Sequence, residues 1–368
     1  MALLDVKGTS TYSDSISAVR TFAKGTISEL ALGILGSKEV KPHTLIWFPA
    51  HVGQIKGAPR NLNESFAVPR GFIITTESYK VFSSSEHFQQ LMRTMETAMT
   101  RDDWQTALKG ICSSMVGALE RLNMPADVQE AISQRLSKFD KDTLFAVRSS
   151  ALGEDSEDMS AAGQMTTLLG VRGQDNVISA VVKCWASQFS FTNVNYKRQY
   201  GQALEVPMAV VVQELVNADT AGVMFTCDPL TGNPGYITVT ANYGIGESVV
   251  SASAEPDTFV LKKRGSQHPT IESSQIGHKS VYTTTSGSDA VATVSVSAEK
   301  AQRACISEED VQILAAIGAE IEKTYTTPQD IEWALKDGIF FMLQLHAGRS
   351  TRQKGLPALW LVHPADMA

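Results

Sequence analysis

The apolar positions of the chain form their clearest pattern between residues 208 and 240. Residues 208–212 are an unbroken apolar run with three consecutive valines, which predicts a short strand buried on both faces. Residues 222–226 predict a second strand, and residues 236–240, where apolar residues alternate with threonines, predict a third. Asp, Pro, Gly and Asn lie between the second and third strands and predict tight turns. The stretch therefore predicts a β-sheet with a buried first strand.

Other parts of the chain show the three- and four-residue spacing of amphipathic helices. Residues 90–122 have this spacing, interrupted near 100–102, which predicts a pair of packing helices. Residues 126–136 predict a short helix, and residues 175–199 predict a longer amphipathic one. Ser307 is followed by three acidic residues, which predicts a helix start with a capping serine. Both strands and helices are therefore expected in the fold.

The remaining segments give weaker signals. Two apolar segments, 45–48 and 72–75, flank a loop rich in Gly, Pro and Asn. Residues 144–147 predict another short buried strand. Residues 1–40 predict a helix or two on the outside of the fold, and residues 270–296, rich in Ser, Thr and Gly, predict exposed strands or a loop.

Composition narrows the class of protein. The 368 residues are 43% hydrophobic and 19% charged, which is ordinary for a globular protein with two or three lobes. A net charge of −7 without a run of Lys or Arg argues against nucleic acid as a partner. No apolar stretch approaches the roughly 20 residues of a membrane span. The four cysteines are scattered without a C-x-x-C pair, so a reducing, cytoplasmic location is expected.

Two places carry candidate chemistry for a nucleotide. Gln213 and Glu214 follow the buried run, and polar groups at the end of a buried strand suit the edge of an adenine ring in an apolar slot. Arg148 follows the strand at 144–147, where its planar guanidinium would suit phosphate oxygens. The alternative for Arg148 is a structural ion pair with a nearby acid.

A third place is a predicted hairpin that contains Glu332 and Gln344. A carboxylate and an amide oxygen suit Mg²⁺, which takes its other ligands from water and substrate phosphates. A shared ion requires both side chains on one face, and a two-residue turn would place them on opposite faces. We therefore predict an odd-length connection at 336–338, with Glu332 opposite Met342 and Asp330 opposite Gln344. The alternative is a surface acid and an amide on an ordinary hairpin.

Four linked motifs occur within some fifty residues of the chain and match the pattern of a known family. They are the apolar strand, GV-F--DP-TG from Gly222, G-GE--V from Gly244, and the dipeptide Pro256-Asp257. The chain resembles the nucleotide-binding domain shared by phosphoenolpyruvate synthase, pyruvate phosphate dikinase and rifampin phosphotransferase. Further matches are V-P-x-G-F from Val68, V-R-S-S around Arg148, A-G-Q at 162–164, and QDIEWA with FMLQ near the C-terminus. An ordinary mixed sheet with well-placed turns is the alternative.

The resemblance implies an α+β fold of the ATP-grasp type, with two lobes that each have a mixed or antiparallel sheet and packed helices, and with the nucleotide between them. It covers roughly residues 45–349 and implies an N-terminal lobe at 41–207 and a C-terminal lobe at 208–350, which leaves an N-terminal extension of unknown role at 1–40 and a tail at 351–368. It implies that Lys56 and Arg148 act on phosphate and that Glu332 and Gln344 hold Mg²⁺. The residues implied to bind ATP are Lys56, Arg148, Gly163, Gln164, Gln213, Glu214, Val216, Asp228, Thr231 and Gln344.

The motifs depart from the family pattern at two positions. The turn that carries Lys56 has one extra residue, and the usual L-Q-x-R-P reads Leu-Gln-Leu-His-Ala, with His346 in place of the arginine and Arg349 three residues later. The resemblance implies that the chain activates Mg-ATP for phosphoryl transfer to a histidine on a swivelling domain, in trans or on a missing segment. The alternative is a catalytically silent nucleotide-binding regulatory module or fragment.

Overall fold

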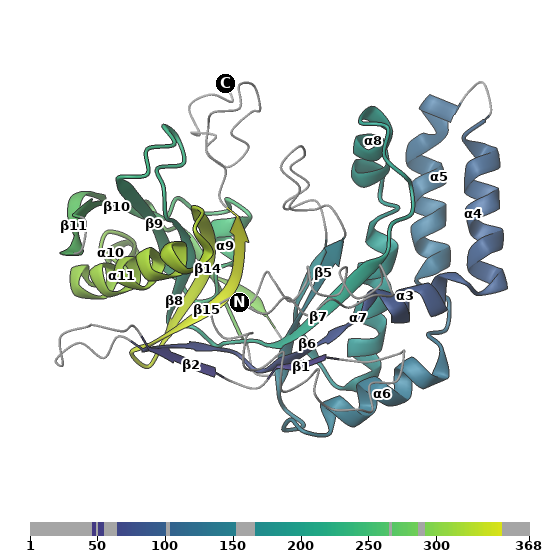
Figure 1. Ribbon diagram of the computed structural model, residues 1–368, viewed down its shortest axis with the longest axis horizontal. Coiled ribbons are helices and arrows are strands. Elements are labelled where there is room, and N and C mark those ends of the chain that lie inside the picture. Colours follow the sequence, from purple (N-terminus) through teal and green to yellow (C-terminus); the bar gives the residue numbers. More distant parts are fainter. Residues whose placement is uncertain are drawn as a thin grey trace, which may run out of the picture. The chain divides into compact units, whose positions relative to one another are not determined.

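Strands and helices are distributed over two units, each with its own sheet and core (Figure 1). The computed structural model describes residues 46–48, 51–54, 65–100, 104–151, 166–264, 267–285 and 291–347. Of these, 46–48, 70–100, 104–151 and 166–215 belong to the first unit, and the others belong to the second. The expected α+β architecture is confirmed, because each unit combines a sheet with packed helices.

The first unit is built on a five-stranded antiparallel sheet. Its central strand is β7, which corresponds to the apolar run predicted to be buried, and six of its seven residues are buried. The sequence analysis expected this strand to open the C-terminal lobe, whereas the contacts place it in the first unit. The strands in sheet order are β1 (Ile46–Phe48), β4 (Gly71–Ile74), β7 (Met208–Glu214), β5 (Leu144–Ala151) and β6 (Thr167–Arg172).

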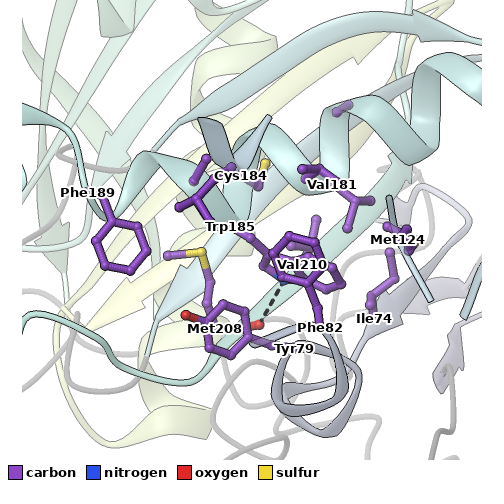
Figure 2. Close-up of a cluster of buried hydrophobic side chains, with 14 of the residues drawn as sticks. Ile74, Tyr79, Phe82, Met124, Val181, Cys184, Trp185, Phe189, Met208 and Val210 are labelled. Atoms are coloured by element: carbon purple, nitrogen blue, oxygen red, sulfur yellow. Dashed lines mark hydrogen bonds between the residues drawn. The ribbon is translucent and has the colours of Figure 1, made fainter. Parts of the chain in front are cut away.

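Helices cover one face of this sheet, and their apolar side chains form its core with the strand residues that point toward them. Trp185 is at the centre, and its indole Nε1–H donates to the backbone oxygen of Met208 at 3.2 Å (Figure 2). Tyr79 and Phe82 contact the Trp185 ring. The helices are α3 (Thr76–Ser83), α4 (Glu86–Ala98), α5 (Trp104–Leu119), α6 (Ala126–Leu136), α7 (Gln174–Ser187) and α8 (Phe191–Gln199).

The predicted helix pair at 90–122 and the helix at 126–136 are confirmed as α4, α5 and α6. The single helix predicted at 175–199 is wrong, because the structure divides it into α7 and α8. The hydroxyl of Ser190 accepts from the backbone N–H of Asn193 and so caps a new helix at this point. Side-chain capping by serine competes with helix continuation, and the apolar spacing alone does not reveal it.

The second unit is built on an eight-stranded sheet in which the β15–β3 neighbours are parallel and the other neighbours are antiparallel. The strands β2 and β3 lie inside the segment that the sequence predicts as a loop. In sheet order they are β11 (Gln267–Gln275), β10 (Asp257–Arg264), β9 (Tyr236–Tyr243), β8 (Thr220–Phe225), β14 (Gln329–Lys336), β15 (Ile339–Ala347), β3 (Ser65–Val68) and β2 (His51–Gln54). A separate hairpin joins β12 (Val281–Thr284) to β13 (Ala292–Ser295).

The helix α11 (Glu308–Tyr325) packs across one face of the eight-stranded sheet (Figure 1). Ser307 caps its first turn by accepting from the N–H of Asp310, as predicted. A Cβ at Gly318 would lie 2.5 Å from the Met224 side chain, so this position holds the helix close to the sheet. Two short helices, α9 (Glu247–Val250) and α10 (Ala298–Ala301), complete the unit. Among the described residues, no helix combines the length and apolar character required to cross a membrane.

A fully buried ion pair holds the second unit together at the start of β10. The Asp257 and Lys279 side chains are both 0% exposed, and the ammonium donates to the carboxylate. The same carboxylate accepts from the N–H of Gly277 at 3.0 Å and from the N–H of Cys305 at 2.7 Å. A buried carboxylate with several donors is stable only when all its acceptor positions are used. The aspartate of the Pro-Asp motif therefore has a structural role.

Candidate functional site

The end of β7 separates its two polar side chains onto opposite faces of the first sheet. Gln213 pairs with Ala146 of β5, and Val211 pairs with Arg148. Because alternate residues of a strand share a face, Gln213 and Arg148 lie on the same side of the sheet. Glu214 pairs with Phe145, whose ring belongs to the helix-covered core. The structure thus brings Gln213 and Arg148 together, whereas the sequence analysis grouped Gln213 with Glu214.

Glu214 is engaged by an arginine on its own face. Arg70 Nε donates to one carboxylate oxygen at 2.9 Å and Nη2 donates to the other at 3.2 Å. The guanidinium also lies 5.0 Å from the centre of the Phe139 ring. The hydrogen bond and the charge of Glu214 raise the pKa of Arg70 above its ordinary value. The predicted contact between the Glu214 side chain and adenine would have to compete with this two-point ion pair.

Arg148 extends from a strand that is hydrogen-bonded on both sides. Its residue pairs are Val211 on β7 and Thr167 on β6. Its neighbour Val147 is fully buried in the helix-covered core, so the Arg148 side chain points to the other face. A guanidinium on a strand that is hydrogen-bonded on both sides is well oriented to bind an anion. Its role as a phosphate ligand stays a prediction.

The DP-TG motif forms a turn that is held by its own side chains. The Asp228 carboxylate accepts from the N–H of Leu230 at 2.9 Å and from the N–H of Thr231 at 2.7 Å. The Thr231 hydroxyl accepts from the N–H of Asn233 at 3.3 Å. These bonds are typical of an Asx turn and an ST turn. The oxygens predicted to contact ATP therefore shape the turn, and a role in nucleotide binding stays a prediction.

Of the other predicted nucleotide ligands, the structure describes only Val216. Val216 lies just after β7, and its carbonyl accepts from the N–H of Ala218 at 2.9 Å. Lys56, Gly163 and Gln164 lie outside the described residues. Their proposed contacts with phosphate stay predictions.

In the β14–β15 hairpin, Glu332 and Gln344 share a face as predicted, but the irregularity that brings them there is not in the turn. Its turn has two residues, Asp337 and Gly338, both with positive φ, and Lys336 pairs with Ile339. The predicted three-residue connection is therefore wrong. The extra residue is Leu343, which forms a β-bulge between the Trp333–Met342 and Glu332–Gln344 pairs.

This bulge changes the predicted partners. Glu332 is directly opposite Gln344 and not Met342, and Asp330 is opposite His346 and not Gln344. Directly opposed residues of an antiparallel pair have Cβ atoms about 4.5–5.5 Å apart and share a face. Glu332 and Gln344 therefore share a face, as predicted, and are closer neighbours than predicted. The predicted register would place Trp333, Phe341 and Leu343 in the core on the other face; Trp333 is buried there, but Phe341 and Leu343 are only partly buried, and Phe340, Met342 and Leu345 are buried instead.

Four polar side chains consequently gather on one face of the hairpin: Asp330, Glu332, Gln344 and His346. The amide nitrogen of Gln344 and Nε2 of His346 are 2.7 Å apart. Burial raises the pKa of Asp330 to about 7, the charge of His346 acts against this rise, and Glu332 adds to it. The sequence analysis did not select Asp330 or His346 as ligands. The i, i+2 spacing of Asp330 and Glu332 is the signal that could have identified Asp330.

The donor set of this face fits a magnesium ion that is shared with a phosphate ligand. Within the described ranges no three His, Cys, Asp or Glu side chains are arranged to hold a metal by themselves. Mg²⁺ does not require such a cage, because it commonly takes one or two protein oxygens and completes its shell with water and phosphate. Glu332 and Gln344 offer one carboxylate and one amide oxygen from directly opposed positions. These two residues would hold the ion.

Known proteins with similar sequences are longer than this chain. It is 33% identical to the probable phosphoenolpyruvate synthase of Methanocaldococcus jannaschii over 288 residues, which cover 77% of the chain and 24% of that protein. It is 33% identical to the rifampicin phosphotransferase of Streptomyces sviceus over 297 residues, which cover 80% and 33%. A solved D-alanine–D-alanine ligase from Bacillus anthracis aligns with 64% of the chain at 9% identity, and its TM-score of 0.23 is too low to carry an argument.

The family model described as "Pyruvate phosphate dikinase, AMP/ATP-binding domain" matches residues 51–357. The matched range contains Arg148 and Gln213 in the first unit and the β14–β15 hairpin in the second. The chain spans a quarter to a third of the length of the two relatives named above. It belongs to the family of pyruvate phosphate dikinase AMP/ATP-binding domains.

Proposed function

We propose that the chain binds Mg-ATP and activates it for phosphoryl transfer to a histidine on a separate swivelling domain, as part of a phosphoenolpyruvate synthase-like phosphotransferase. Membership of the ATP-binding family supports the nucleotide, and the names of the relatives support the phosphotransferase class. The observation that carries the proposal is the direct opposition of Glu332 and Gln344 on one face of the hairpin. We place this activity in the cytoplasm and assign it to an ATP-grasp fold.

The residues would act by positioning and by neutralising charge. Bound Mg²⁺ would supply neutralisation of the negative charge on the transferred phosphoryl group. Arg148 would orient phosphate oxygens from a strand fixed on both sides, and Lys56 would add a second positive charge. Gln213, on the same face as Arg148, would offer hydrogen bonds to the nucleotide. Preorganised donors of this kind lower a barrier without any covalent step by the protein.

A second candidate is a catalytically silent module that binds a nucleotide for regulation. The observation that favours it is His346, which stands where the family pattern has an arginine. A histidine cannot offer the two-point fork of a guanidinium to phosphate. The two candidates share nucleotide binding and differ in phosphoryl transfer.

Calorimetric titration with Mg-ATP, together with thermal unfolding, tests the shared part. Ligand at about 100 times its dissociation constant adds roughly 2.7 kcal/mol to the free energy of unfolding, so the melting temperature should rise by several degrees. Absence of both heat and shift at millimolar Mg-ATP would contradict nucleotide binding.

The transfer step is tested by mixing the chain with Mg-[γ-³²P]ATP and the isolated swivelling domain of a related phosphoenolpyruvate synthase. Acid-labile, base-stable label on that domain is expected, and it should fall strongly in Glu332→Gln. ATP binding without label transfer would favour the silent module.

A further inference from the structure

Arg172 is the last residue of β6, the strand at one edge of the first sheet. It pairs directly with Leu144 of β5. β5 pairs with β7 without a register shift, and the N–H of Leu215 extends this pairing to the carbonyl of Leu144, so Leu144 and Arg148 lie on one face. Because directly opposed residues share a face, Arg172 lies on the face of Arg148. Its neighbour Val171 packs against the helix-covered core, as this assignment requires.

A β-bulge in β6 brings Arg172 to this face. Thr167, at the other end of the strand, pairs with Arg148 and therefore lies on the same face. Thr167 and Arg172 are five residues apart, so strict alternation would put them on opposite faces. The register between β5 and β6 shifts by one residue, and Gly170, which lies within the shift, has a φ of 71°. The bulge thus adds an arginine to the face that carries Arg148 and Gln213.

Arg148, Gln213 and Arg172 follow one another along this face. Gln213 lies opposite Ala146, two residues from Arg148 on β5. Arg172 lies opposite Leu144, two residues further along β5. Four residues of a strand span about 14 Å, which exceeds the length of a triphosphate group. A single nucleotide that extends along the face would therefore meet Arg148 with its phosphates and Arg172 with its base.

The backbone of Arg172 is fixed where β6 meets α7. Asn176, in the first turn of α7, donates from its side-chain amide to the backbone oxygen of Arg172 at 2.8 Å. Gly173 lies between β6 and α7 with a φ of 80°. The Arg172 side chain is only partly exposed, and its Nε is buried. A guanidinium whose stem is held in this way loses little further freedom when it meets a flat ligand.

We propose that Arg172 is a specificity-determining residue that packs its guanidinium against the adenine ring of bound ATP. This inference rests on the proposed function, in which Arg148 orients phosphate and Gln213 offers hydrogen bonds to the nucleotide. A guanidinium is planar and stacks on nucleic acid bases, and its N–H groups can donate to the acceptor nitrogens of adenine. Stacking on the larger purine ring would favour ATP over pyrimidine nucleotides.

The first test is calorimetric titration of the full chain with adenosine, Mg-ATP and inorganic tripolyphosphate. Arg172→Met should weaken adenosine and Mg-ATP by about 3- to 10-fold and leave tripolyphosphate within about 2-fold of the native value, which also shows that the variant is folded. Arg148→Ala should show the reverse pattern, with a loss for tripolyphosphate and not for adenosine. Lys183→Met, at an exposed position on α7, is the matched control for the loss of one positive charge and should bind all three ligands as the native chain does.

The second test uses Arg172→Lys and Mg-CTP. Lysine keeps the charge but not the plane, so Arg172→Lys should recover little of the adenosine affinity that Arg172→Met loses. A phosphate contact would behave differently, because lysine binds phosphate well as a point charge. Mg-CTP has the ribose and the phosphates of Mg-ATP with a smaller base, so its affinity should fall less than that of Mg-ATP in both variants.

Each of the following results would overturn the inference while leaving ATP binding intact: unchanged adenosine affinity in Arg172→Met, full adenosine affinity in Arg172→Lys, or equal losses of Mg-ATP and Mg-CTP in Arg172→Lys. Because Arg172→Lys keeps the charge, it decides the question even if Arg172→Met does not fold. Native chain that binds neither adenosine nor Mg-ATP would overturn the proposed function, and the assignment of Arg172 would be overturned with it.

Discussion

The end of β7 and the β14–β15 hairpin use the alternation of strand side chains in opposite ways. β7 pairs regularly with β5, so its neighbours Gln213 and Glu214 lie on opposite faces. β15 contains a bulge at Leu343, so Gln344 lies on the face of Glu332, which a regular two-residue hairpin would have prevented. Residues that are adjacent in a motif can thus be separated in space, and residues that strict alternation would separate can be joined.

The largest effect should follow from breaking the sheet that carries the hairpin. A Cβ at Gly222 of β8 would lie 1.9 Å from the backbone oxygen of Thr240, so any side chain forces β8 and β9 apart. Gly222→Val should lower the free energy of unfolding by about 3 kcal/mol or more, measured by urea denaturation. Gly110→Ala in α5 is the control, because nothing lies within 4 Å of its Cβ position and a helical alanine is favoured by up to about 1 kcal/mol. A loss below about 1 kcal/mol in Gly222→Val would contradict the close β8–β9 packing.

The next effect concerns the face that Arg148 shares with Gln213. Arg148→Ala should weaken ATP by about 10- to 100-fold, since a hydrogen bond to a charged group contributes about 1.5–3 kcal/mol, and should leave adenosine nearly unchanged. Calorimetric titration with both ligands measures this difference. Arg93→Ala, exposed on α4, controls for the loss of one positive charge. Equal losses for ATP and adenosine would identify Arg148 as a structural ion-pair residue.

A smaller effect should distinguish the two neighbours at the end of β7. Gln213→Leu should weaken adenosine by about 2- to 10-fold, which corresponds to one neutral hydrogen bond. Glu214→Gln should change adenosine affinity less than 2-fold, because its carboxylate is bound to Arg70 on the opposite face, and should cost under about 1 kcal/mol of stability. The same calorimetric titration measures both variants. A larger loss of adenosine affinity in Glu214→Gln than in Gln213→Leu would show that Glu214, and not Gln213, contacts the nucleotide.

The smallest effect on nucleotide affinity is expected from removing the bulge residue Leu343. Deletion of Leu343 removes the bulge and leaves Glu332 opposite Gln344, so the affinity for Mn²⁺-ATP should change less than 3-fold. Deletion of Leu343 together with Phe341, which is paired with Ala334, should shift the register by one residue, bring Gln344 opposite Trp333 and weaken Mn²⁺-ATP strongly. If the Leu343 deletion instead strengthens binding tenfold, the native hairpin is regular and the bulge is not present in solution.

The sequence predicts most of the secondary structure because apolar spacing determines which face of each element is buried. The buried run that became β7, the helices α4 to α6 and the capped start of α11 are confirmed. The split between α7 and α8 was missed, because it depends on one serine cap and not on apolar spacing. Strands β2 and β3 were missed because their pairing partners include the distant β15.

The common face of Glu332 and Gln344 was predictable from the sequence, whereas the geometry that produces it was not. The requirement that Glu332 and Gln344 share a face gave the right outcome, but the extra residue was placed in the turn. Asp337 and Gly338 favour a two-residue turn so strongly that the irregularity moves into the strand. The Arg70–Glu214 pair was missed because its members are far apart in the sequence and only the β4–β7 pairing brings them together.

A double-mutant cycle on Glu332 and Gln344 tests the central claim most directly. Calorimetry with Mn²⁺-ATP would compare the native chain, Glu332→Gln, Gln344→Leu and the double variant, with Glu272→Gln on exposed β11 as the charge control. The account predicts about a 10-fold loss for each single variant and a double variant that is better than additivity by at least about 0.5 kcal/mol, as for residues that share one ligand. Losses that add within error, or no loss in either single variant, would contradict a cation shared across the hairpin.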